Sequence, residues 1–218
     1  MIRKLSCLVV IYFVIVLVLS SSAYAQVVTE TEGQPDRIRG DITEVDSSSI
    51  VVKSKDGKLV TISLEDYSSI FSLTKASFSD VDFGVYVGSI SRKLDKYSPI
   101  VRDSLSWLHQ GYELRIIDES LRGLAVGHTP WDLTSESVIT HGWVDDLEIR
   151  VLSIKYGPTE EEETDVDISR DVPILKLSMG NKTLIKLGAH VFVGAQMVED
   201  KYVAVFIMVG EGDIVPPL

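Results

Sequence analysis

One segment concentrates side chains that could bind a ligand. Residues 121–133 have the sequence LRGLAVGHTPWDL and contain a guanidinium, an imidazole, an indole and a carboxylate: Arg122, His128, Trp131 and Asp132. Two interpretations remain open. In the first, Trp131 fills an apolar slot between two structural units, and Arg122 pairs with Asp132 or a nearby carboxylate. In the second, these side chains line a ligand cleft at a domain junction, where such clefts are common.

Metal chemistry has less support from the spacing of possible ligands. The chain has four histidines, His109, His128, His141 and His190. No two of them stand at the spacing of a helical pair or a compact metal loop, and a zinc site usually needs three or four protein ligands. The acidic segments 80–82 and 165–167 lack the glycine and the distal glutamate of an EF-hand loop. We therefore expect no bound metal and no cofactor.

Signatures of enzyme catalysis are also missing from the sequence. It contains no Gly-x-Ser-x-Gly elbow and no glycine-rich loop of the kind that holds phosphates. Its single cysteine, Cys7, lies in the N-terminal apolar run, so a processed chain has neither disulfides nor a catalytic thiol. We expect a protein that is not an enzyme and has no catalytic residues.

The elements that position these side chains repeat along the chain. One copy opens with RIRGDITEV at residues 37–45, and the other opens with ITHGWVDDL at 139–147. A second glycine pair follows in each copy, at residues 84–88 and at residues 188–194. A repeat of this length indicates one structural unit used twice.

Within each copy, the pattern is that of short strands. Asp56-Gly57 between two apolar runs predicts a tight hairpin, because the glycine adopts a positive φ without steric strain. A single helical turn or a loop is expected over residues 78–84, and one short helix from Ser98 to about Gly111. The pattern predicts an all-β fold of two tandem small OB-like barrels, with that helix in or after the first.

These elements divide the chain into six segments. We expect a signal peptide at 1–25, a flexible leader at 26–36 and a first OB-like barrel at 37–120. A junction rich in glycine, histidine and tryptophan follows at 121–136, a second OB-like barrel at 137–213 and a tail at 214–218.

The N-terminus indicates export. Arg3 and Lys4 precede an apolar run at residues 5–19, and an Ala-x-Ala site ends at Ala25. The run is short for a permanent anchor, so we expect cleavage, with retention as an anchor as the alternative. We place the protein in the periplasm or outside the cell, with no membrane span after signal removal. The net charge of −11 disfavours nucleic acid as a partner, and we expect an unknown protein or small molecule instead.

Several segments resemble a known group of exported Gram-negative bacterial proteins. The resemblance rests on LRGLAVGHTPWDL, ITHGWVD at 139–145 and LIKLGAHVFVGA at 184–195. RIRGDITEVD at 37–46 and VVKSKDGKLVTISL at 51–64 resemble the barrel repeat of the domain-of-unknown-function class numbered 5666. Many members of the group carry the automatic label "metal ABC transporter permease". The resemblance implies tandem barrels and no established activity, and we do not expect a permease of this chain.

We therefore expect an exported, soluble, non-enzymatic binding or interaction module whose ligand is unknown. The alternative is a periplasmic accessory protein that binds a small ligand or a metal cation for a transport system.

Overall fold

The computed structural model describes residues 35–94 and 108–216, and the regular elements in these residues are β-strands and short 3-10 turns. The strands of the first part are β1 (Asp36–Val45), β2 (Ser49–Ser54), β3 (Leu59–Ser63), β4 (Ser69–Lys75), β5 (Tyr86–Lys93) and β6 (His109–Ile117). Those of the second part are β7 (Gly127–Pro130), β8 (Ser137–Glu148), β9 (Val151–Lys155), β10 (Glu163–Asp167), β11 (Ile174–Met179), β12 (His190–Val198) and β13 (Lys201–Gly210). The 3-10 turns are η1 (Phe78–Asp80), η3 (Glu119–Leu121) and η4 (Lys182–Leu184). The prediction of an all-β protein is confirmed for the described residues.

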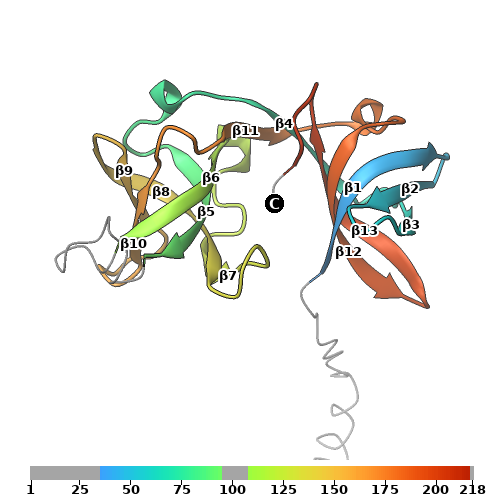
Figure 1. Ribbon diagram of the computed structural model, residues 1–218, viewed down its shortest axis with the longest axis horizontal. Coiled ribbons are helices and arrows are strands. Elements are labelled where there is room, and N and C mark those ends of the chain that lie inside the picture. The colour runs from blue at the N-terminus through green and yellow to red at the C-terminus, as the bar shows by residue number, and fades with distance from the viewer. Residues whose placement is uncertain (1–34, 95–107, 217–218) are drawn as a thin grey trace, which may run out of the picture. The chain divides into compact units, whose positions relative to one another are not determined.

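Five of these strands close into a barrel. β1 pairs with β2, β2 with β3, β13 with β12 and β12 with β1, all antiparallel, and a parallel pairing of β3 with β13 closes the ring (Figure 1). Alternate residues of a strand point to opposite faces, so one face of each strand can be apolar. The buried cluster of this barrel includes Ile42, Val52, Ile62, Val191 and Ile207.

Five further strands follow the same series of pairings. β8 pairs with β9, β9 with β10, β6 with β5 and β5 with β8, all antiparallel, while β10 pairs with β6 in parallel. A separate buried cluster accompanies these strands and includes Val87, Leu114, Val144, Leu152 and Val166. β7 also pairs with β8, in antiparallel orientation.

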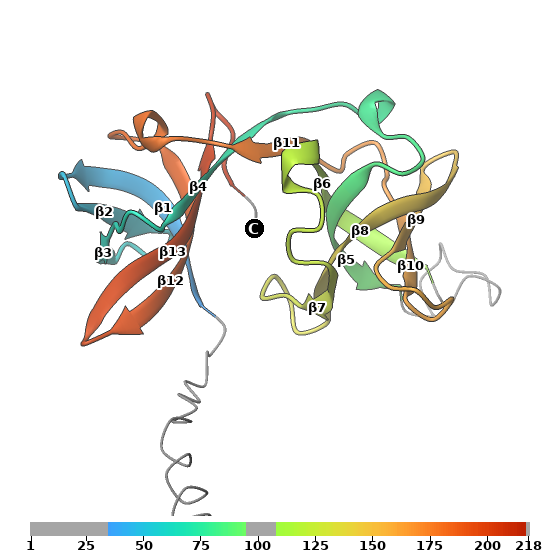
Figure 2. The same cartoon turned by 180° about the vertical axis from the view of Figure 1, so that it is seen from behind.

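The pairings cross the division that we expected at residues 121–136. β1, β2 and β3 pair with β12 and β13 from the end of the chain, whereas β5 and β6 pair with β8, β9 and β10 (Figures 1 and 2). β4 and β11 pair with each other, and they also pair with β13 and β6 respectively. The sequence repeat does not predict which strands pair, because each strand could pair equally well with the equivalent strand of either copy.

Two local predictions can be compared with the structure. The Asp56-Gly57 hairpin is confirmed, since β2 and β3 are paired and Gly57 has a φ of 84°. The predicted helix from Ser98 lies mostly at residues 95–107, outside the described residues. Gly111, which we expected to end it, lies inside β6 instead.

Candidate functional site

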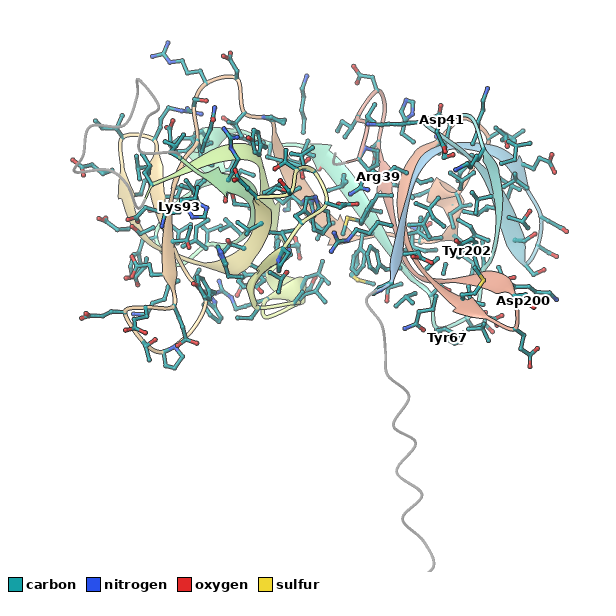
Figure 3. The ribbon with its side chains drawn as sticks, turned by 60° about the horizontal axis from the view of Figure 1, so that its bottom comes forward. Arg39, Asp41, Tyr67, Lys93, Asp200 and Tyr202 are labelled. Carbon is teal, nitrogen blue, oxygen red and sulfur yellow. The ribbon has the colours of Figure 1, made fainter. Side chains whose placement is uncertain are left out.

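Two of the four predicted site residues meet at one ionic cluster. Asp132 accepts hydrogen bonds of 2.8 Å from both Nη1 and Nη2 of Arg39, and Nη1 of Arg37 lies 3.2 Å from its Oδ1. The guanidinium of Arg37 lies over the Trp131 ring, 4.1 Å from the ring centroid. Figure 3 labels Arg39, which extends from β1. Hydrogen bonding from Arg39 lowers the pKa of Asp132 below its ordinary value.

Arg122 belongs to a different group of contacts. Its guanidinium pairs with the Glu119 carboxylate three residues earlier, and its Nη2 donates to the carbonyl oxygen of Gly84 at 3.0 Å. The hydrogen bond with Glu119 raises the pKa of Arg122. This exposed pair attaches η3 to the turn before β5.

His128 belongs to a third group, formed by aromatic rings. Its Nδ1 lies 2.8 Å from Oγ1 of Thr140, and its ring stacks on Tyr156 with 5.3 Å between ring centroids. His109 lies edge-on to it at 5.8 Å. Burial lowers the pKa of His128, and it lowers the pKa of His109 to about 4, with smaller contributions from the charges of His128 and Lys93. Both rings are therefore neutral near pH 7.

A cavity of about 510 Å³ lies beside the junction. Its apolar lining includes Ile90, Leu133, Ile174, Leu175, Ile214 and Val215. Its polar lining consists of Lys75, Tyr112, Glu113 and Asp213. Of the predicted junction segment, the residue that contributes to this lining is Leu133.

Strand register brings several of the lining residues next to one another. Glu113 of β6 stands opposite Ile90 of β5, and Leu175 of β11 stands opposite both Arg115 of β6 and Lys75 of β4. Residues i and i+2 of a strand share a face, so Glu113 and Arg115 lie on the same face of β6. The opposite face of that strand carries Leu114, which belongs to the buried cluster of β5, β6, β8, β9 and β10.

Glu113 and Arg115 form an ion pair that is almost fully buried. Nε of Arg115 donates to Oε1 of Glu113, and the side chains are only 1% (Arg115) and 8% (Glu113) exposed. Nη2 of Arg115 is buried and has no hydrogen-bond partner among the described residues. Burial, together with the charge of Arg115, lowers the pKa of the nearby His141 to about 3, so that ring is neutral.

The chain after β13 forms one wall of the cavity. The backbone N–H of Glu211 donates to the carbonyl oxygen of Leu73 at 2.9 Å, and the Ser72 hydroxyl donates to the Glu211 carboxylate. A Cβ on Gly210 would lie 1.8 Å from the carbonyl oxygen of Ile214, so only glycine lets the tail turn back so closely. These contacts hold Ile214 and Val215 against the cavity.

Sequence reasoning missed Glu113 and Arg115. Charged residues that alternate with Leu114 and Ile116 are typical of a strand with one solvated face, and this pattern hides a buried pair. The signal that could have found them is their position in the segment Tyr112 to Ile117, whose other residues are apolar or aromatic.

Comparisons with known proteins give no relative: no protein-family model, no curated protein and no solved structure matches the chain. The resemblance to exported tandem-barrel proteins therefore stays a prediction. Within residues 35–94 and 108–216, no helix is long and apolar enough to cross a membrane. In the same residues, no three histidine, aspartate or glutamate side chains come together as metal ligands.

Proposed function

We propose that this protein is an exported, non-enzymatic binding module of two OB-like barrels, and that it holds a small, largely apolar molecule in the cavity beside the junction. The observation that carries the proposal is the cavity itself. Its volume of about 510 Å³ falls in the range of small-molecule sites, and such sites combine apolar walls with a few placed polar groups. Export rests on the signal pattern at 1–25, which lies outside the described residues.

The OB-like interpretation of both strand sets is supported by equivalent hydrogen bonds. In one set, the N–H of Ile42 donates to Ala189 at 3.0 Å and the N–H of Gly188 donates to Ile42 at 2.8 Å. In the other set, the N–H of Val144 donates to Val85 at 3.0 Å and the N–H of Gly84 donates to Val144 at 2.8 Å. Each set also contains one parallel pairing at the same place in its series. Two copies of one duplicated barrel would have these features.

A binding role fits the chemistry of the cavity. Glu113 is engaged by Arg115, and the remaining charged lining residues, Lys75 and Asp213, are exposed. A carboxylate held by a buried guanidinium is suited to orienting a ligand through hydrogen bonds.

A fluorescent probe can test this proposal. N-phenyl-1-naphthylamine is uncharged and apolar, and it fluoresces strongly when it leaves water. We expect saturable binding to the wild-type protein. Binding to Leu133→Trp should be at least about ten-fold weaker, because the indole would take up space in a cavity that holds about one small molecule.

The matched control is Leu59→Trp, which places the same side chain at a position on β3 that is 64% exposed. This variant should bind like the wild type. Equal binding by Leu133→Trp and Leu59→Trp would show that the probe does not occupy the cavity and would refute the proposal.

A further inference from the structure

Glu113 lines a cavity whose walls are mostly apolar. Its side chain is 8% exposed, and Glu113 is one of the residues that line the cavity. Directly opposite on β5 stands Ile90, which also lines it. A charged acceptor in apolar surroundings interacts more strongly with a donor than it would in water.

Arg115 leaves acceptor capacity on this carboxylate. An ionised carboxylate offers about four lone-pair sites, and arginine often fills two of them through a paired contact. Here Nε of Arg115 donates to Oε1, while Nη2 of the same guanidinium is buried without a partner among the described residues. Arg115 therefore does not make the bidentate contact, with two parallel hydrogen bonds, that is common between arginine and a carboxylate.

The guanidinium of Arg115 does not line the cavity. Arg115 is 1% exposed and is not among the lining residues, whereas Glu113 is. A molecule that enters the cavity thus meets an acceptor first. Lys75 and Asp213 at the lining are exposed and opposite in sign, so solvent and salt screen them.

The matching strand of the other set has no ion pair at this register. In the closed barrel, Phe206 and Met208 of β13 occupy the register positions that Glu113 and Arg115 occupy in β6. Replacing a buried ion pair with apolar residues is often neutral or stabilising. The pair at β6 therefore needs an explanation other than stability.

We infer that the cavity selects apolar molecules that carry an N–H or O–H donor and no negative charge, with Glu113 as the acceptor. This inference rests on the proposed function and names its ligand class. A ligand donor completes the coordination of the carboxylate, while an anion in the same place is repelled and desolvated without compensation.

Two probes that share one skeleton provide the test. N-phenyl-1-naphthylamine carries an N–H donor and no charge, and 8-anilinonaphthalene-1-sulfonate adds a sulfonate to the same rings. We expect the wild-type protein to bind the uncharged probe at least about ten-fold more tightly, because both probes carry the N–H donor but the Glu113 carboxylate repels the sulfonate of the second. The measurement is the ratio of the two dissociation constants by fluorescence titration.

Variants at Glu113 separate the role of its charge from general hydrophobicity. Glu113→Gln should bring the ratio to within about three-fold, since the amide no longer repels the sulfonate. Glu113→Leu/Arg115→Met removes both charges, leaves no unpaired guanidinium, and should have the same effect on the ratio. Glu44→Gln, an exposed change on β1, should keep the wild-type ratio.

The outcomes distinguish the two proposals. An unchanged ratio in both Glu113 variants, with Leu133→Trp still blocking the probes, overturns the role of Glu113 and leaves the binding function standing. Wild-type protein that binds the sulfonate as tightly as the uncharged probe also overturns the role of Glu113 alone. Failure of both probes to bind saturably to the wild-type protein overturns both proposals.

Discussion

The two sets of strands share one backbone frame but fill its outer face differently. At the pair of positions next to the bulge, β6 carries Glu113 opposite Ile90, and β13 carries Phe206 opposite Gly194. Two residues later, β6 has a buried arginine, Arg115, where β13 has Met208. The frame thus accepts either an ion pair or an apolar pair at the same register.

The neighbours of these positions differ in a matching way. In one set, Arg115 stands opposite Gly88, which stands opposite His141. In the other set, Met208 stands opposite Phe192, which stands opposite Arg39. Arg39 turns its guanidinium outward to Phe192 and Asp132, whereas Arg115 is enclosed. The comparison shows that the two sets of strands have the same series of backbone pairings, while the side chains at matching positions differ.

Among the variants that compare the two sets of strands, Arg115→Met should cause the largest loss of stability. It leaves Glu113 as a buried charge without its cation, and we expect a loss of about 3–5 kcal/mol in the free energy of unfolding. Glu113→Phe/Arg115→Met copies the residues of β13 and should lie within about 1 kcal/mol of the wild type. Urea denaturation at pH 7 measures both. A double variant as unstable as the single one would mean that the two sets are not interchangeable at this register.

Gly40→Ala and Gly142→Ala test whether the two sets of strands both exclude a Cβ at the matching glycine. An added Cβ would lie 2.0 Å from the carbonyl oxygen of Lys53 at the first position and 2.2 Å from that of Lys155 at the second. Both variants should therefore lose about 1–3 kcal/mol through overpacking. Thermal and urea unfolding measure the losses. If one variant were destabilised and the other were not, the two glycine positions would not be equivalent.

Asp132→Asn should give the smallest effect, because the Asp132 side chain is 40% exposed and its contacts with Arg37 and Arg39 are partly screened. We expect a loss of up to about 1 kcal/mol at pH 7. The pKa of Asp132 is lowered in the folded state by Arg39, so the stabilisation is present above the unfolded pKa. It is lost as pH falls through the folded pKa.

Unfolding curves for wild type and Asp132→Asn, measured as a function of pH, provide the check. The free energies of unfolding of the two proteins should converge at acidic pH. Their difference at pH 7 should shrink at high salt concentration. A difference that grew as the pH fell would contradict this account of the cluster.

Much of the local structure could be predicted from the sequence. The hairpin at Asp56-Gly57 depends on neighbours in the chain, and so do the turns before Gly84 and Gly188, both of which have a φ of 77°. The junction site was predicted less well. Trp131 and Asp132 share arginine partners, but Arg122 and His128 have contacts of their own elsewhere.

Local patterning, turn chemistry and the internal repeat are properties of short stretches, so the all-β character of the described residues was already present in the order of amino acids. The partner of each strand was not, because equivalent strands of the two copies offer the same hydrogen-bonding edges and compete for the same places. Only the folded chain brings β4, β5, β6, β11 and the tail around Glu113. Burial depends on all of these distant segments at once, which is why a charged pair whose pattern is typical of a solvated face is buried instead, with Glu113 at the wall of a cavity.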